Sequence, residues 1–338
     1  MPEPRELTRR AFLTAASVGS LTVFSRAQSP QFTFAQYHNQ LEDTPLHRRL
    51  TEMWATVRKE SGGRVDTHVY AYNNKNPGSD PAVLKLLVAG EVHFFTLMGG
   101  ILANVVPAAN IQQVPFAFRS ADQAHKTVDG PLGTYLCGEM ASKGIVGFQV
   151  GAFDNGMRQI AGRTRPVMTP ADMVGMKMRV PDGQMFDDMA RALGAEPVTV
   201  NSSDIYGALQ KGTVDAQENP LAYMDFFKHY EVMKYCSMTN HMWSGFNMLA
   251  NKAAWDRLPA DIQASIERNL TRAVRLQREE QQKANAAART SLASHGLAFN
   301  EVDQALFRAK MTGLYANWKK MLGAKAWSLL EAETGKLG

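Results

Sequence analysis

Residues 64–72 read Arg-Val-Asp-Thr-His-Val-Tyr-Ala-Tyr, and every second side chain from Val65 to Ala71 is apolar or β-branched. This period of two predicts a β-strand. Directly before it, residues 44–61 place apolar side chains three and four positions apart and end at the pair Gly62-Gly63. That spacing predicts a helix, because residues three and four apart share one helical face, and the glycines predict where the helix ends.

The same two patterns occur on both sides of this pair. Residues 32–37 predict a strand before the first helix, and residues 80–89 predict a second helix that ends at Gly90. Residues 92–98 again have a strand pattern. The order strand, helix, strand, helix, strand predicts an α/β fold whose sheet is rich in parallel strands and has helices on its faces.

The alternation continues along the rest of the chain. Strands are expected at residues 145–153, 177–180, 197–199 and 242–250, and helices at residues 121–143, 169–173, 183–193, 203–211 and 220–227.

The composition of the sequence changes near the C-terminus. Residues 259–294 are rich in strong helix formers and have no internal glycine or proline, so they predict one helix about 54 Å long at about 1.5 Å per residue. A helix of that length should run across two domains, which a chain of 338 residues allows. Two shorter helices are expected at residues 302–320 and 325–334.

The composition is that of a globular chain, and it excludes several classes of protein. Hydrophobic residues make up 45% and charged residues 20%, with a net charge of +5. This mixture excludes a mostly disordered or collagen-like chain, and the interspersed charges give no basic stripe for a nucleic acid. The two cysteines, Cys137 and Cys236, exclude a disulfide-dense scaffold, and the sequence leaves their pairing open.

The motifs that mark cofactor and metal sites are missing. The eight histidines show no metal-ligand spacing. No glycine-rich dinucleotide or phosphate loop and no Gly-x-Ser-x-Gly nucleophile elbow is found. We therefore expect no metal and no cofactor. These absences weaken an enzymatic interpretation without excluding it.

Residues 1–27 have the features of an export signal. Arg9 and Arg10 stand directly before an apolar stretch at residues 11–24, which is short for a membrane-spanning helix. The stretch is followed by Ser-Arg-Ala at residues 25–27, a small-x-small cleavage pattern. The arginine pair resembles the bacterial twin-arginine (Tat) signal, with a general secretory signal as the alternative, and both predict delivery to the periplasm.

Arg179 is the first candidate binding residue. It lies in Gly-Met-Lys-Met-Arg-Val-Pro-Asp at residues 175–182, where Met178 and Val180 bury one face of the strand and Arg179 lies on the other. Pro181 ends the strand, so Arg179 is expected at a carboxyl end, where open α/β sheets bind ligands. The planar guanidinium suits a carboxylate through two parallel hydrogen bonds, and a surface ion pair is the alternative from local sequence alone.

Asn219 is the second candidate. Pro220 favours an extended conformation at the residue before it, and an amide side chain there can donate to an anion or a hydroxyl. A helix N-cap is the alternative role for Asn219, and the two roles are compatible.

Three segments together resemble the substrate-binding proteins of tripartite ATP-independent periplasmic (TRAP) transporters. They are Gly-Met-Lys-Met-Arg-Val-Pro at residues 175–181, Tyr-Gly-Ala-Leu-Gln-Lys-Gly-Thr-Val-Asp-Ala-Gln-Glu-Asn-Pro at residues 206–220, and Tyr-Glu-Val-Met-Lys-Tyr at residues 230–235 with Thr-Asn-His at residues 239–241. The resemblance covers the mature chain in order. Its most specific part is Gln-Glu-Asn-Pro together with the upstream Arg-Val-Pro.

The resemblance implies a two-lobed fold similar to the type II periplasmic binding proteins, with mixed sheets flanked by helices and the ligand in a hinged cleft. The expected parts are lobe I at residues 28–153 with part of residues 242–258 returning to it, lobe II at residues 154–241, a spanning helix at residues 259–295, and C-terminal helices at residues 296–338.

The resemblance also implies binding roles by position. Arg179 matches the family's main carboxylate-binding arginine, Asn219 matches its asparagine, and Arg158 matches a second arginine seen in the sialic-acid-binding branch. One more residue separates the two arginines here than in that branch. Further pocket positions match Asp80, His38 or Asn39, Met98, and Phe246, with Trp243 as the second choice for an apolar wall.

Two pocket positions depart from the sialic-acid branch. Met98 stands where that branch carries an acidic residue, and Ser202 stands where it carries a phenylalanine. These departures argue against sialic acid and favour a smaller organic acid. A hydroxy acid, a sugar acid and an aromatic acid all remain open.

The function that the resemblance implies is that of a periplasmic solute-binding protein, and not of an enzyme. It captures a small carboxylate and delivers it to the small and large TRAP membrane subunits, with a transient membrane-protein contact and a monomeric binding protein. The alternatives are a binding protein for an ATP-driven (ABC-type) importer, a Tat-exported enzyme acting on a small carboxylate, and an accessory protein that presents ligand to a membrane sensor.

Overall fold

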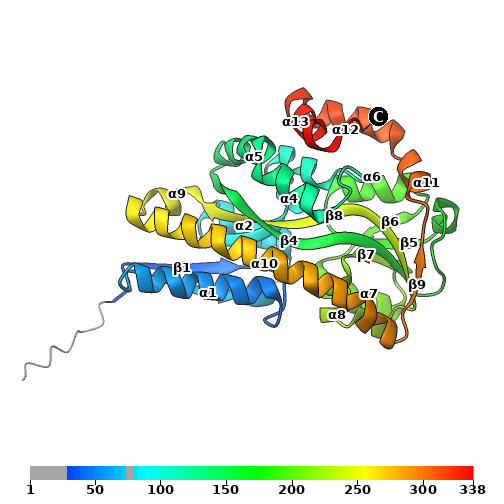
Figure 1. Ribbon diagram of the computed structural model, residues 1–338, viewed down its shortest axis with the longest axis horizontal. Coiled ribbons are helices and arrows are strands. Elements are labelled where there is room, and N and C mark those ends of the chain that lie inside the picture. Colours follow the sequence, from blue (N-terminus) through cyan, green and yellow to red (C-terminus); the bar gives the residue numbers. More distant parts are fainter. Residues whose placement is uncertain (1–28, 74–78, 338) are drawn as a thin grey trace, which may run out of the picture.

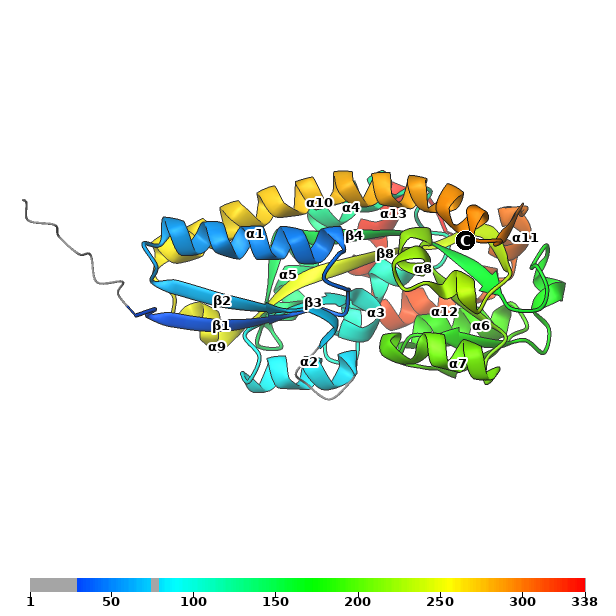
Figure 2. The same cartoon turned by 90° about the horizontal axis from the view of Figure 1, so that it is seen from below.

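The computed structural model describes residues 29–73 and 79–337. The molecule is elongated, and one long helix runs along one face of the sheet, in front of it in the view of Figure 1 (Figure 1, Figure 2). The predicted export signal at residues 1–27 lies outside the described residues. No helix in the described ranges combines the length and the apolar character that crossing a membrane requires.

One mixed sheet of nine strands forms the centre of the described structure, in the order β2-β1-β3-β8-β4-β7-β5-β6 with β9 beside β8. Parallel pairs lie at both ends of this order and antiparallel pairs at its centre, so each end is a parallel α/β unit. The strands are β1 Phe32–Tyr37, β2 Val65–Tyr70, β3 Phe94–Met98, β4 Ile145–Gly162, β5 Lys177–Val180, β6 Glu196–Thr199, β7 Ala216–Asn219, β8 Tyr235–Asn251 and β9 Ala298–Glu301.

Helices lie on both sides of this sheet (Figure 2). They are α1 Pro45–Glu60, α2 Asp80–Ala89, α3 Gly99–Leu102, α4 Ala121–Asp129, α5 Pro131–Ala141, α6 Gln184–Ala192, α7 Ile205–Lys211, α8 Leu221–Phe226, α9 Lys252–Asp256, α10 Ala260–Ser294, α11 Gln304–Ala309, α12 Thr312–Leu322 and α13 Ala324–Thr334. Short 3₁₀ helices lie at Ala71–Asn73, Pro107–Gln113, Pro170–Met173, Ser202–Asp204 and His229–Glu231.

Two long antiparallel strands, β4 and β8, join the two ends of the sheet. β4 continues past Phe153, where the sequence pattern predicts its end, and β8 begins at Tyr235 rather than at Met242. Both predictions are wrong for one reason: the additional residues include polar side chains, such as Asp154, that break the apolar pattern but are buried in the sheet. The lobe boundaries expected from the sequence therefore fall within these two strands.

Two helices that the sequence predicts as continuous are broken. The predicted helix at residues 121–143 is α4 followed by α5, because Pro131 has no amide hydrogen and starts a new helix after Gly130. The predicted helix at residues 302–320 is divided into α11 and α12 at Met311, where neither glycine nor proline marks the break. The patterns also miss β7 and β9, which have only 4 residues each.

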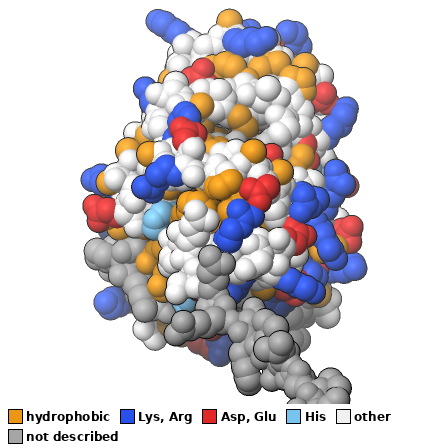
Figure 3. All heavy atoms as spheres, turned by 90° about the vertical axis from the view of Figure 1, so that its left-hand side faces the viewer, with side chains coloured by type: hydrophobic (Ala, Val, Ile, Leu, Met, Phe, Trp, Pro, Cys, Tyr) orange, Lys and Arg blue, Asp and Glu red, His pale blue; other side chains and the backbone are white. Residues whose placement is uncertain are grey.

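The structure shows whether the two cysteines pair and how charged side chains are distributed on one face of the molecule. Cys137 on α5 and Cys236 on β8 are both free thiols, so they do not pair. On the face shown in Figure 3, the described Lys and Arg side chains are interspersed with Asp and Glu side chains. That face therefore lacks the one-sided basic surface that a nucleic acid would need.

The long helix α10 is present as predicted, and it packs on α1 at one end and on α8 at the other. At its centre, the buried Gln277 side chain bonds the backbone of β4. Its Oε1 accepts from the Asp154 amide at 2.9 Å, and its Nε2 donates to the Asp154 carbonyl at 2.7 Å. These bonds occupy backbone groups at a point where the pairing of β4 with β8 shifts register, between Asp154 and Gly156.

Replacing Gln277 with alanine should lower the free energy of unfolding by about 2–4 kcal/mol, because a buried amide and a buried carbonyl would both lose their partner. Urea unfolding followed by circular dichroism measures the change. Glu279→Ala is the matched control, since Glu279 is exposed on the same helix. Equal effects of the two substitutions would contradict the role assigned to Gln277.

Candidate functional site

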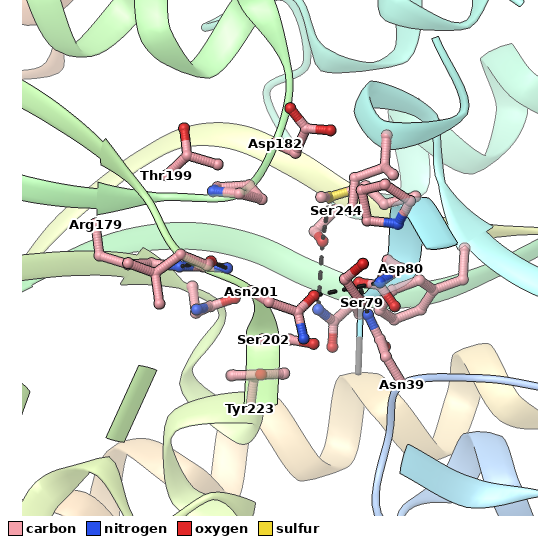
Figure 4. Close-up of a pocket in the computed structure, with 18 of the residues that line it drawn as sticks. Asn39, Ser79, Asp80, Arg179, Asp182, Thr199, Asn201, Ser202, Tyr223 and Ser244 are labelled. Atoms are coloured by element: carbon pink, nitrogen blue, oxygen red, sulfur yellow. Dashed lines mark hydrogen bonds between the residues drawn. The ribbon is translucent and has the colours of Figure 1, made fainter. Parts of the chain in front are cut away.

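A cavity of about 260 Å³ lies between the two ends of the sheet, and both ends supply its lining. Asn39 and Asp80 come from the elements around β1 and α2, and Arg179 and Tyr223 from those around β5 and α8. In Figure 4, Arg179 and Asp80 enter the cavity from opposite sides. The carboxyl ends of several strands meet here, as expected for a ligand site of an open α/β sheet.

Arg179 is a buried cation that lies near carboxylates without forming a direct ion pair among the described residues. The residue is 3% exposed, and its Nε and one terminal nitrogen donate to the Val200 carbonyl at 2.8 and 2.6 Å. Among the described residues, no carboxylate forms an ion pair with it. Burial lowers the pKa of the Arg179 guanidinium to about 10, against the opposing effects of Tyr223 and Glu218. The site therefore holds a desolvated positive charge with its outer edge directed at the cavity lining.

Arg158 lines the same cavity, but its positive charge is paired with a carboxylate. Its guanidinium forms a two-pronged ion pair with the buried Glu218 of β7, in which one terminal nitrogen lies 2.6 Å from Oε1, and it also donates to Ser244 Oγ at 3.1 Å. Burial alone would raise the pKa of Glu218, but Arg158 and His241 bring that pKa below its ordinary value. The charge of Arg158 is thus already neutralised within the protein.

Asn219 is the last residue of β7, and both ends of its side-chain amide have a partner within the protein. Its Oδ1 accepts from Arg158 at 3.2 Å, and its Nδ2 donates to Gln217 Oε1 at 2.6 Å. Pro220, and not Asn219, occupies the N-cap position of α8. Asn219 therefore lies at the cavity beside Arg158, and the N-cap role that the sequence leaves open is not adopted.

The opposite side of the cavity is rich in hydrogen-bond acceptors. Asp80, the first residue of α2, accepts from Asn39 Nδ2 at 2.8 Å and from Asn73 Nδ2 at 2.7 Å. Burial raises the pKa of the Asp80 carboxyl, against the lowering effects of both amides and Arg179. The Asp80 backbone amide donates to Asn201 Oδ1 at 3.3 Å, which links the two sides of the cavity. This side is suited to hydroxyl groups, which can donate to the Asp80 carboxylate.

An apolar wall joins these two polar sides. Met98 of β3 and Phe246 of β8 are directly opposite each other in the antiparallel ladder, and both line the cavity. Trp243, the second choice for this wall, lies outside the lining, and its Nε1 donates to Asp154 Oδ1 at 2.8 Å. The ligand is therefore expected to present an apolar or carbon-rich surface toward β3 and β8.

Of the neighbouring pair at the end of β1, the structure brings Asn39 to the cavity and does not bring His38. His38 is fully buried, its Nε2 lies 2.9 Å from His47 Nδ1, and burial lowers its pKa to about 3.

Several lining residues were not identified from the sequence. Thr199 ends the predicted strand at residues 197–199 and Asn201 follows it, so the rule that ligands bind at carboxyl ends of strands would have found them. Asn155 belongs to the part of β4 that the patterns did not predict, whereas Ser244 lies within the strand predicted at residues 242–250. Tyr223 lies on α8, and no local pattern distinguishes it from a core aromatic.

Direct contacts also close the space beside the cavity. Asn104 Nδ2, after α3, donates to Asp182 Oδ2, after β5, at 2.7 Å. The Phe186 ring of α6 packs on Gly100 of α3 so closely that a Cβ at Gly100 would lie 2.7 Å from Phe186 Cε2. Gly100 therefore leaves the space that this approach of α6 requires.

A cavity with a buried arginine, enclosed by two α/β units that share two long strands, is the arrangement of a solute-binding protein. The chain belongs to the bacterial extracellular solute-binding proteins of family 7 (DctP), whose model matches residues 36–321. The C4-dicarboxylate-binding periplasmic protein of Rhodobacter capsulatus is 28% identical over 98% of this chain and 100% of the relative.

Solved structures support the same assignment. A TRAP periplasmic solute-binding protein from a Sulfitobacter species, with β-D-galacturonate bound, has a TM-score of 0.84 at 26% identity and covers 90% of this chain and 100% of that chain. A TRAP protein from a Polaromonas species, bound to D-erythronate, has a TM-score of 0.84 at 25% identity and covers 90% of this chain and 98% of that chain. The predicted TRAP relationship and fold class are confirmed, and these relatives are binding proteins rather than enzymes.

The buried, neutral histidines predict sensitivity to acid. Burial lowers the pKa of both His38 and His229 from 6.5 to about 3, so below pH 6.5 the unfolded chain binds more protons than the folded one. The free energy of unfolding should therefore fall as the pH falls from about 6.5 toward 3, by about 1.4 kcal/mol per pH unit for each histidine.

Urea unfolding at pH 7.0, 6.0 and 5.0 measures this slope. His38→Gln and His229→Gln should each reduce the slope of the unfolding free energy against pH by about 1.4 kcal/mol per pH unit. His295→Gln, at an exposed position, should leave that slope unchanged. A slope that neither buried substitution changes would show that other groups cause the acid sensitivity.

Proposed function

We propose that this chain is a periplasmic solute-binding protein that captures a small organic acid through Arg179 and delivers it to the membrane subunits of a TRAP transporter. The single observation that carries the proposal is the buried Arg179 charge, which has no ion-pair partner among the described residues. Removing an unpaired cation from water is costly, so an anionic ligand that restores the balance of charge binds strongly.

The hydrogen bonds of Arg179 define how the acid approaches. Its Nε–H and one N–H of a terminal nitrogen are used by the Val200 carbonyl. A guanidinium has five N–H donors, so the pair at its outer edge remains for the two oxygens of a carboxylate. Val200 thereby fixes the plane of the guanidinium before the ligand arrives. Asn219 uses one of its two N–H donors on Gln217, so the other can bind the acid, and Arg158 can add the N–H that otherwise meets Met98 Sδ at 3.7 Å.

The opposite side of the cavity favours a hydroxylated monocarboxylate. Asp80 lies there between Asn39 and Asn73, and a second ligand carboxylate beside it would be repelled when Asp80 is ionised. Hydroxyl groups, in contrast, can donate to Asp80. The related proteins that hold β-D-galacturonate and D-erythronate, which are hydroxylated acids, support this choice among the acids that the sequence leaves open.

Ligand capture and cleft closure are coupled in this proposal. The acid contacts residues from both ends of the sheet, and its binding energy favours the conformation in which those residues lie together. The residues nearest to a hinge are those of β4 and β8, at the expected lobe boundaries. The closed, monomeric protein then docks transiently on the small and large TRAP subunits in the periplasm. No bond of the ligand is broken, and no cofactor takes part.

Replacing Arg179 with alanine should weaken carboxylate binding by at least about 100-fold, because truncating one partner of a buried, hydrogen-bonded charge pair costs about 2–5 kcal/mol. Isothermal titration calorimetry with D-galacturonate, D-erythronate and succinate measures the change. Arg191→Ala is the control, since the Arg191 side chain is 60% exposed and outside the cavity lining. Unchanged affinity in Arg179→Ala would remove Arg179 from its proposed role.

Replacing Asp80 with asparagine should change which acids bind. The substitution keeps the shape of the side chain and removes a negative charge. The affinity for succinate relative to that for D-erythronate should therefore rise by about tenfold, which corresponds to about 1.4 kcal/mol. The ratio of the two dissociation constants, measured in wild type and variant, is the test. An unchanged ratio would mean that Asp80 does not exclude a second carboxylate.

A further inference from the structure

Tyr223 is a buried cavity residue whose hydroxyl has no partner within the described part of the chain. The residue is 3% exposed and lines the cavity, and its hydroxyl oxygen makes no hydrogen bond there. A buried hydroxyl without a partner is unfavourable, and such groups in a native structure call for an explanation. A ligand that supplies an acceptor would provide one.

The ring of Tyr223 is held in place by neighbouring aromatic rings. It stacks on Phe227 with the centroids 4.2 Å apart and an interplanar angle of 21°. It also meets the His229 ring edge to face at 5.7 Å. Because both contacts fix the ring, the hydroxyl cannot move away to find a partner elsewhere without disrupting this packing.

Tyr223 is also a neighbour of the unpaired cation. Arg179 and Tyr223 lie close enough for each to influence the pKa of the other, and burial raises the pKa of the Tyr223 phenol well above its ordinary value. The phenol therefore keeps its proton and can act as a donor at neutral pH. Two donors, one neutral and one charged, thus lack an anionic acceptor in the same part of the cavity.

We propose that Tyr223 is a further ligand-binding residue, whose hydroxyl donates a hydrogen bond to the carboxylate that Arg179 binds. A carboxylate has about four acceptor positions, and the outer edge of Arg179 fills two of them. The phenol can fill a third without adding charge. This inference rests on the proposed function, since it needs an acid in the cavity.

The chain offers a matched pair of substitutions to test this role. Tyr223→Phe removes a hydroxyl without a protein partner, so the stability of the ligand-free protein should stay equal or rise, while affinity for the acid should fall by about 10- to 100-fold. Tyr315→Phe removes a hydroxyl that donates to the Pro115 carbonyl at 2.9 Å in an equally buried place. That variant should lose stability and keep its affinity.

The experiment measures both quantities on the mature chain, with urea unfolding for stability and calorimetry with D-galacturonate and D-erythronate for affinity. Unchanged affinity in Tyr223→Phe, with normal binding by wild type, would overturn this inference and leave the proposed function standing. A loss of stability like that of Tyr315→Phe would assign Tyr223 a structural role and also overturn it. Absence of acid binding by wild type would overturn the proposed function and this inference together.

Discussion

The cleft depends on a positive charge that is buried without a direct ion pair in the described part of the chain. The guanidinium of Arg179 is almost out of contact with solvent, and the Val200 carbonyl accepts hydrogen bonds from two of its nitrogens. Such a group destabilises the empty site and is relieved by an anion. The same desolvation that makes the empty site unfavourable would strengthen the proposed ligand contact, since a low local dielectric strengthens each charge-assisted hydrogen bond. In the proposed function, affinity for an acid and a cost to the empty protein are thus two consequences of one burial.

Arg158 shows that residue type alone does not decide such a role. It is buried in the same cavity as Arg179, but Glu218 neutralises it and His241 holds Glu218 from the other side at 3.1 Å. This pairing arises because β4 and β7 are neighbours, an arrangement that brings together residues about sixty positions apart in the sequence. In the proposed function, Arg179 therefore supplies net charge to the cavity and Arg158 does not. A second unpaired guanidinium would attract a second carboxylate, so the Arg158–Glu218 pair favours a proposed ligand with a single negative charge.

The two long strands and α10 explain how polar groups can be held in the middle of the molecule. β4 carries Asp154 to Arg158 through its centre, where the ladder with β8 is irregular and backbone groups would otherwise lack partners. Side chains of α10 occupy them: Gln277 bonds both backbone groups of Asp154, and Arg278 donates to the Ala152 carbonyl. The side chains of α10 thereby hold the irregular part of β4 on one face, and residues on its other face can line the cavity. Gly156, whose φ is +114°, adds to this design, because a Cβ there would collide with Asn285 of α10.

How far the sequence predicts this molecule depends on the range of the interactions involved. Elements defined by local periodicity, such as β1 to β3 with their helices and α10, are present close to where the patterns place them. The patterns fail where polar residues are buried by partners distant in sequence, as in the second half of β4. The cavity follows the same division. Arg179 and Asn219 carry local signals, because a proline follows the end of each strand: Pro220 comes directly after Asn219, and Pro181 comes two residues after Arg179. Tyr223 carries none, since what distinguishes it from a core aromatic is a partner missing from its surroundings, and only the three-dimensional neighbourhood reveals that.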